Sequence, residues 1–309
     1  MSKIINLKEN MNNSNIKSFE ILPQKRNVTI GLALGSGAIR GLAHIGIIDE
    51  LLKGGIKINE ICGSSIGSII GCLYAGGMNI AQIKETACEI SAEMVFDYRI
   101  PFISLFRGKK LKNFITDIFH KKLRIKKLEE LNTKVFITVV DILKGIPVIL
   151  REGPIVDSIM ASCAVPLAFP PYKLHGGHYI DGGVLLPVPS SVLKGRGHDV
   201  ITGINLGFGN LYKKLPCIFH IAGQTIITMG RQLVEMQKNY SDCLITPEFN
   251  DIGYWQFKRA AEIIEIGQKS GRLAVHEIIK AAANKKNTKI NYEITNKAVN
   301  VSQKININV

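Results

Sequence analysis

Short apolar runs alternate with longer amphipathic stretches along most of the chain. The runs that predict buried strands are 28–34, 135–141, 200–206 and 244–246, with 146–150 as a hairpin or edge partner of the second. The stretches whose apolar residues recur at helical spacing are 79–95, 220–236 and 257–283. Strands that alternate with helices favour a parallel sheet between helical layers, so we expect an α/β fold.

The first strand opens into a glycine-rich loop, Gly35-Ser36-Gly37-Ala38-Ile39-Arg40-Gly41, which precedes a helical stretch. This order places free backbone N–H groups at a helix start, which makes an anion site. A dinucleotide phosphate is one candidate anion, although the dinucleotide-binding motif requires a third glycine where this chain has Arg40. The other candidate is the transient oxyanion of a tetrahedral intermediate, held by the loop amides.

A second motif, Gly63-Ser64-Ser65-Ile66-Gly67, has the Gly-x-Ser-x-Gly pattern of a turn between a strand and a helix. Ser65 stands at its tip, and the flanking glycines let strand and helix approach closely. The pattern also describes tight helix packing, because Gly71 continues the four-residue spacing. A membrane span over 61–83 is a further alternative, but five glycines, Asn79 and Gln82 argue against it.

Asp181 follows Tyr179-Ile180 and precedes Gly182-Gly183, which places it at a strand end free of crowding. From there its carboxylate could take the Ser65 proton as general base. The same residues are equally typical of an ordinary Asp-Gly turn.

The formal net charge of +14 is the unusual feature of the composition. It suggests an anionic partner, either nucleic acid or an anionic lipid surface. The segment 107–127 concentrates nine Lys or Arg against the single acid Asp117. Its apolar residues recur at helical spacing, so it is either a core-facing helix with solvated ends or a cap that rests on a bilayer or covers the site.

The cysteine pattern and the local composition indicate the compartment and the domain organisation of the chain. Six scattered cysteines without a C-x-x-C pair fit reduced thiols in a cytosolic protein and no zinc site. No apolar core of a secretory signal precedes the first strand, so we expect a disordered lead-in over 1–27, although export without a cleaved signal would leave no such trace. One domain is expected over 28–283, followed by a polar, basic and poorly ordered tail over 284–309.

The glycine-rich loop, the Gly-x-Ser-x-Gly turn and Asp181-Gly182-Gly183, in that order and spacing, resemble the patatin-like phospholipase family. Ala161-Ser162 and Pro166 resemble the family's block ahead of the aspartate. The similarity covers about 28–208 and is strongest to compact bacterial members and to the catalytic domain of neuropathy target esterase. It implies a three-layer α/β/α fold and hydrolysis of acyl esters in phospholipids, lysophospholipids or neutral lipids.

Carried over by position, the resemblance makes Ser65 the nucleophile and Asp181 the base of a catalytic dyad. It makes the backbone amides of Gly37 and Ala38 the oxyanion donors, with Arg40 holding their loop. The glycines that support these motifs are Gly35, Gly41, Gly63, Gly67, Gly182 and Gly183.

Two positions depart from the family, since Ser36 and Ala38 stand where many members have glycine. Ala38 can donate its N–H only where the loop does not need a φ reserved for glycine. A Ser-Asp-His triad also stays open, because three histidines follow the aspartate in the required order. These are His198, His220 and His276, each in a setting typical of structural or exposed histidines. His44 lies near the loop and is expected to pack or bond locally.

The expected function is a serine lipid acyl hydrolase that needs no cofactor or metal and acts on phospholipids or lysophospholipids. One alternative is a catalytically silent patatin fold that acts as a regulatory or binding module. Another is a nucleotide-binding protein that uses the Gly35 loop. We expect a cytoplasmic protein with peripheral contact to anionic membranes through 107–127 and no nucleic-acid partner.

Overall fold

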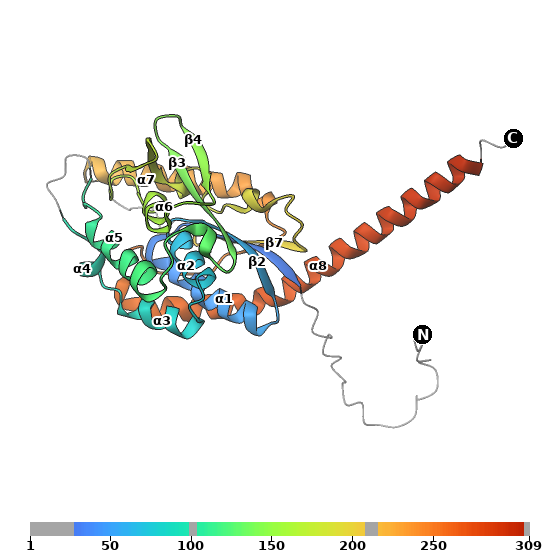
Figure 1. Cartoon of the computed structure of the whole chain (residues 1–309), viewed down its shortest axis with the longest axis horizontal. Coiled ribbons are helices and arrows are strands. Elements are labelled where there is room, and N and C mark those ends of the chain that lie inside the picture. The colour runs from blue at the N-terminus through green and yellow to red at the C-terminus, as the bar shows by residue number, and fades with distance from the viewer. Residues whose placement is uncertain (1–27, 99–103, 208–215, 306–309) are drawn as a thin grey trace, which may run out of the picture.

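The computed structural model describes residues 28–98, 104–207 and 216–305, so the lead-in expected over 1–27 lies outside the described residues. Figure 1 shows a twisted central sheet with helices packed along it. Its strands are β1 (Thr29–Leu34), β2 (Lys57–Ser64), β3 (Lys134–Asp141), β4 (Ile146–Leu150), β5 (Tyr172–Leu174), β6 (Gly177–Asp181), β7 (Val200–Ile204) and β8 (Cys243–Ile245). Their spatial order is β5-β6-β3-β2-β1-β7-β8, with β4 paired to β3.

The centre of the sheet is parallel. β1 pairs in parallel with both β2 and β7. The pairings of β2 with β3 and of β7 with β8 are parallel as well. β4, β5 and β6 join antiparallel at the β3 side, and β4 is the hairpin partner expected from the sequence. Together with the helices on both sides, this mostly parallel sheet confirms the predicted α/β/α fold.

The helices are α1 (Ala43–Lys53), α2 (Ile66–Ala75), α3 (Ile80–Glu89), α4 (Ala92–Val95), α5 (Lys109–Thr116), α6 (Ile155–Ser162), α7 (Ile218–Gln237) and α8 (Ala260–Ile305). Helices α1, α2, α3, α5, α6 and α8 contribute to the main core on one face of the sheet. The other face carries a smaller core around Ala33, Cys62 and Phe136, covered in part by Leu193 and by Val234 of α7. The two helical layers are therefore unequal, and α7 belongs to the thinner one.

Two segments resolve alternatives that the sequence left open. The uncharged run 61–83 is not one helix, because it holds the end of β2, all of α2 and the start of α3, which Asn79 caps by accepting the Gln82 N–H at 2.9 Å. Across the three described ranges, no helix is both long and apolar enough to cross a bilayer. The sequence predicts that the last helix ends at Ala283, but α8 continues to Ile305. The described part of the expected tail therefore lies in this helix.

Candidate active site

The register of β3 brings the Gly-x-Ser-x-Gly turn and Asp181 together. On one edge of β3, Thr138 pairs with Ser64 of β2 and the next residue, Val139, pairs with Asp181 of β6. Strand β4 pairs with the same stretch of β3, so β2 and β6 must share the opposite edge, end to end. The last residue of β2 and the last residue of β6 therefore lie one step apart along β3.

Ser65 occupies the sharp turn between β2 and α2. Its backbone has φ 54° and ψ −124°, a conformation that L-residues rarely adopt and that costs about 1–3 kcal/mol. The glycines beside it allow the close approach expected from the sequence. A Cβ on Gly67 would lie 2.1 Å from the Leu34 carbonyl oxygen, and one on Gly63 would lie 2.6 Å from Cα of Ser68.

Two buried hydroxyls hold this turn in place. The Ser162 hydroxyl accepts the backbone N–H of Ser65 at 2.9 Å and donates to the Thr138 carbonyl at 2.8 Å. The Ser68 hydroxyl donates to the Ser65 carbonyl at 2.6 Å. The sequence marked Ser162 only as part of a family block, and its contact with Ser65 is the feature that the sequence did not reveal. The turn is therefore fastened to β3 and to α6 as well as to its own helix.

Asp181 is buried, with 5% of its surface exposed, and the Ser65 hydroxyl lies against its carboxylate, where it acts to lower the carboxyl pKa. Its Oδ1 also accepts the Gly183 N–H at 2.7 Å. Burial raises the pKa of Asp181 to about 6, while the bonds from Ser65 and Gly183 act in the opposite direction. None of the ion pairs among the described residues includes Asp181. A carboxylate without a paired cation and with a raised pKa is well suited to accept a proton near neutral pH.

The amides of Gly37 and Ala38 are the free donors of the glycine-rich loop. Other loop amides are used, because Gly35 N–H donates to the Ile204 carbonyl at 3.1 Å and Ser36 N–H to the Pro187 carbonyl at 3.0 Å. No acceptor within the described ranges takes the N–H of Gly37 or Ala38, and both residues line a cavity with Ser65. Ala38 has φ 48°, in the left-handed region that a non-glycine residue can reach at a modest cost.

Arg40 lines neither cavity and fastens the loop to a distant segment. Its guanidinium is buried, donates through Nε to the Ile252 carbonyl at 2.9 Å, and is also hydrogen-bonded to it through Nη2. The guanidinium carbon lies 5.1 Å from the ring centroid of Phe249 and 5.0 Å from that of Tyr254. Burial lowers the pKa of Arg40 from its usual value. The side chain thus has the geometry of a support for the loop.

Each of the remaining motif glycines lies too close to a neighbouring atom to carry a side chain without a shift. A Cβ on each would lie 2.2 to 2.4 Å from a neighbouring atom, which leaves no room for a side chain. They are Gly35, Gly41, Gly182 and Gly183.

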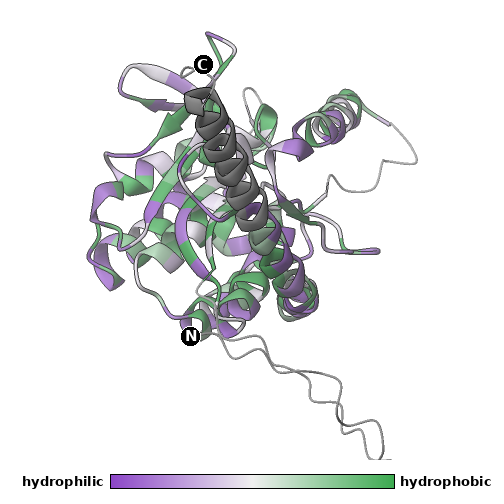
Figure 2. Cartoon of the chain, turned by 90° about the vertical axis from the view of Figure 1, so that its right-hand side faces the viewer, coloured by the Kyte–Doolittle hydropathy of each residue, from purple (hydrophilic) through white to green (hydrophobic). Residues whose placement is uncertain are grey.

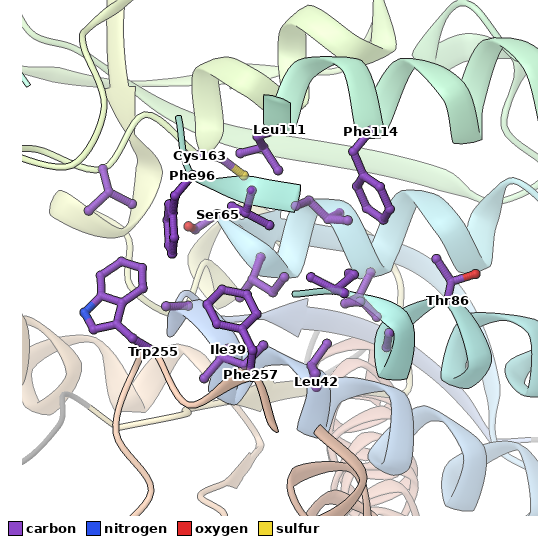
Figure 3. A pocket seen from close by; sticks show the side chains of 18 of the residues that line it. Ile39, Leu42, Ser65, Thr86, Phe96, Leu111, Phe114, Cys163, Trp255 and Phe257 are labelled. Atoms are coloured by element: carbon purple, nitrogen blue, oxygen red, sulfur yellow. The ribbon is translucent and has the colours of Figure 1, made fainter. Parts of the chain in front are cut away.

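Two cavities meet at Ser65. One is narrow and apolar, with a volume of about 120 Å³, and the other is wider and more open, with a volume of about 640 Å³. The residues that line both are Ala38, Ser65, Phe96, Val165 and Trp255. Figure 3 shows the narrow cavity, with Ser65 and Trp255 toward one end and Phe114 and Thr86 toward the other. Asp181, Gly37 and Gly183 line only the wider one.

The segment 107–127 forms part of the narrow cavity's wall. Leu111 and Phe114 of α5 line it, while Ile115 and Phe119 are buried in the core. The apolar stripe of this segment is therefore core-facing, as one of the two sequence interpretations held. Its Lys and Arg side chains are exposed.

Several residues near the site were unassigned or ambiguous in the sequence. The Cys163 thiol is buried, which raises its pKa, and it contacts the hydroxyls of Ser65 and Ser68. His44 binds the Gly35 carbonyl through Nε2 at 2.8 Å, and burial lowers its pKa to about 4, so it is neutral and supports the loop locally. His198 contacts Glu60 at 3.2 Å. Within the described residues, no histidine is hydrogen-bonded to Asp181, and no cluster of three His, Cys, Asp or Glu could hold a metal ion.

Comparisons with known proteins show what this chain is similar to. A profile of the patatin-like phospholipase family matches residues 32–193. An NTE family protein of Mycobacterium tuberculosis is 31% identical over 179 residues, which cover 57% of this chain and 49% of the relative. Lysophospholipase NTE1 of Candida albicans is 31% identical over 187 residues, or 59% of this chain and 13% of the relative. The chain thus spans about half or less of the length of these relatives.

A solved structure shares the fold. The structure of VipD from Legionella pneumophila superposes on 81% of this chain and 67% of its own, with a TM-score of 0.55 at 13% sequence identity. At this identity the likeness shows a common fold.

Proposed function

Because the chain belongs to the patatin-like phospholipase family, we propose that it is a serine hydrolase that cleaves acyl esters of lipids. The observation that carries the proposal is that the Ser65 hydroxyl and the buried Asp181 carboxylate lie together in one cavity, at its junction with a second, apolar one. A hydroxyl is a weak nucleophile until a base removes its proton, and this contact supplies the base.

In the first half of the reaction, Ser65 Oγ attacks the ester carbonyl carbon while its proton passes to Asp181. The oxygen of the tetrahedral intermediate becomes negative and is bound by the free N–H groups of Gly37 and Ala38. The start of α2 at Ser65 adds a favourable dipole. When the intermediate collapses, the leaving alcohol takes the proton from Asp181, and an acyl-enzyme remains on Ser65.

In the second half, water enters through the wider cavity and loses a proton to Asp181 as its oxygen attacks the acyl carbon. The same two amides stabilise the second oxyanion. Its collapse releases the fatty acid and returns the proton from Asp181 to Ser65 Oγ. No residue other than the dyad and the loop amides needs to change its bonding during the cycle.

The shapes of the cavities support a lipid ester as substrate. The narrow cavity is apolar almost throughout, so it suits an acyl chain, and it ends at the nucleophile. The wider cavity contains Asp181, Ser36 and the loop amides, so it suits the more polar alcohol side of the ester. Phospholipids and lysophospholipids are the class we propose, and the name of the Candida relative, a lysophospholipase, supports it.

Fluorophosphonate labelling, read by intact mass, tests the proposal with p-nitrophenyl butyrate turnover in parallel. Wild type should gain one label and turn the ester over. Ser65→Ala should lose both, and Asp181→Asn should lose turnover. Ser64→Ala is the matched control, because Ser64 is the adjacent buried serine on β2 and its hydroxyl has no partner within the described residues. A folded wild type that neither labels nor turns over would favour a silent binding module instead, and titration with ATP or NAD would then test nucleotide binding at the Gly35 loop.

A further inference from the structure

Helix α7 is apolar on two opposite faces, and only one of them is covered. The inner face contributes His220, Gly223, Ile226 and Ile227 to the wall of the wider cavity. Farther along, Val234 packs into the smaller core and the Gln237 side-chain amide donates to the Leu185 carbonyl at 2.9 Å. In Figure 1, α7 lies at the upper edge of the molecule, and in Figure 2 it is seen nearly end-on at the upper right.

The outer face of α7 carries four large apolar side chains in solvent. Ile218, Ile221, Met229 and Met236 are 74%, 51%, 59% and 74% exposed. At about 100° per residue, Ile218 lies about 180° around the helix from the buried Ile227, so the stripe faces directly outward. Thr225 and Gln232 complete it, and residues 218–230 contain no Asp, Glu, Lys or Arg. A contiguous exposed stripe of this kind marks a docking surface.

We infer that this outer face of α7 docks on a lipid–water interface. Three observations favour a lipid surface. The inner face of the same helix lines the cavity that holds Ser65, so docking through the outer face leaves only the width of this helix between the surface and the cavity. The chain carries a net charge of +14, which complements anionic lipids, and the stripe has no acidic residue to oppose it. Tyr98 and Trp255, which also line the cavity, are exposed aromatic residues of the kind that favour a membrane interface.

The helix would lie along the interface. Within the described ranges, no helix meets the length and hydropathy of a span, and α7 has the geometry of a surface helix with its apolar face in the boundary between head groups and acyl chains. The choice of a lipid surface rests on the proposed function, because the substrate would be drawn from that surface. Binding itself needs no turnover, so the two can be tested apart.

Cosedimentation of the full chain with phosphatidylcholine vesicles, and with vesicles that also contain phosphatidylglycerol, tests the inference. Wild type and Ser65→Ala should bind equally, and more strongly to the anionic vesicles. Ile221→Glu combined with Met229→Glu should weaken binding to both kinds of vesicle by about tenfold or more, while Ile221→Leu with Met229→Leu should not. Leu273→Glu is the matched control, because Leu273 of α8 is 68% exposed and lies outside the stripe.

The folding of each variant is checked by circular dichroism and, in the variants that keep Ser65, also by turnover of p-nitrophenyl butyrate, a soluble ester that needs no surface. Equal vesicle binding by wild type and the double glutamate variant would overturn the inference, as would a wild type that binds neither vesicle. So would a wild-type dimer that the glutamate pair dissociates, since the stripe would then be an interface between two copies. Vesicle binding that depends on the stripe, in a protein with no esterase activity, would leave this inference standing and remove the proposed function.

Discussion

The hydroxyl of Ser162 accepts a hydrogen bond from the backbone N–H of Ser65 at 2.9 Å and donates one to the Thr138 carbonyl at 2.8 Å. One buried side chain thereby ties the strained turn at Ser65 to strand β3 and to the end of helix α6. Because β3 also pairs with Asp181 through Val139, the same bond helps to set the distance between Ser65 and Asp181. A turn held at a positive φ needs such support to keep its conformation.

Replacing Ser162 by Ala should therefore impair the site more than the fold. The change leaves a buried N–H and a buried carbonyl without this partner, which costs about 1–3 kcal/mol. We expect kcat on p-nitrophenyl butyrate to fall by about tenfold to a hundredfold through misplacement of Ser65 Oγ, with little change in KM. Ser158→Ala is the control, since Ser158 lies in the same helix, is buried, and bonds only to the Pro154 carbonyl. Equal kcat values in the two variants would remove the positioning role of Ser162.

The pH dependence of turnover should report Asp181. Only the ionised carboxylate can accept the Ser65 proton, and its pKa is raised to about 6 by burial. Therefore kcat/KM should rise as the pH increases through about 6 and level off above it. The measurement is a pH profile with p-nitrophenyl butyrate, with enzyme returned to neutral pH to confirm that low values are reversible. An acid limb near the ordinary aspartate pKa of 3.8 would contradict this assignment.

The same shift has a consequence for stability. The folded-state pKa of Asp181 lies above its unfolded value of 3.8, so folding favours the protonated form and disfavours the ionised one. The loss of folding free energy that comes from ionising the buried Asp181 is absent below pH 3.8. It grows as the pH rises through about 6, toward about 3 kcal/mol. We expect Asp181→Asn to raise the free energy of urea unfolding at pH 7.5, with the gain shrinking toward pH 4. A gain that does not change with pH would assign it to some cause other than ionisation.

Ser65 and Asp181 stand out in the sequence because each lies beside glycines at a short, local spacing. Their meeting was not visible there, because it depends on β2 and β6 sharing one edge of β3, and strand pairing is a long-range property. The strands 135–141 and 146–150 were predicted as partners, yet nothing local indicated that a third strand, β6, would take the other edge. The resemblance supplied the pairing of the two residues that the pattern alone left open.

Other features lay beyond the sequence for a related reason. The helix expected over 220–236 corresponds to α7, but which of its faces is covered depends on what packs against it. The stripe with Leu111 and Phe114 was assigned to a core-facing helix or a cap, and only the packed structure shows that it lines the cavity beside Ser65. Helix α8 continues past the expected end at Ala283, because a polar and lysine-rich composition from residue 284 on does not by itself end a helix.

The glycine-rich loop should be intolerant of added volume at Gly37. A Cβ there would lie 2.8 Å from both Cβ and Cδ1 of Leu206, which is itself buried. We expect Gly37→Ala to push the loop and lower kcat by about tenfold to a hundredfold, since a displaced amide no longer meets the oxyanion. Adding Leu206→Gly removes both obstructing atoms and should recover part of the loss. A double variant as slow as Gly37→Ala, and as well folded, would show that steric contact with Leu206 is not the cause.

The basic segment 107–127 should contribute to binding on anionic membranes, which we propose as a second contact besides α7. Lys122 and Lys126 are exposed, and no ion pair among the described residues includes them. Reversing both charges to Glu should lower binding to phosphatidylglycerol vesicles, because each Lys near such a surface contributes about 1 kcal/mol. The loss should vanish at high salt. The control is Lys57→Glu with Lys134→Glu, which makes the same change in net charge at the strand ends away from Ser65. An equal loss of binding in this control would show that only the overall charge matters.

The narrow cavity should set the acyl-chain preference of the enzyme. The small residue Ala87 of α3 and the large residue Phe114 of α5 both line it. Enlarging Ala87 should reduce the volume of the cavity, and shortening Phe114 should increase it. Ala87→Leu fills space next to Thr86, which Figure 3 places at the end of the cavity opposite Trp255. A long chain would then lose its place, while the four-carbon chain of butyrate needs little depth.

We therefore expect Ala87→Leu to lower kcat/KM for p-nitrophenyl decanoate by about tenfold or more relative to butyrate, because the discrimination available from a few methylenes is about 1–3 kcal/mol. Phe114→Ala should shift the ratio the other way. Each variant controls for the other, since both disturb the packing around the cavity and only their effects on volume differ in sign. Parallel losses on both esters would indicate general damage, and an unchanged ratio in both variants would place the acyl chain in the wider cavity instead.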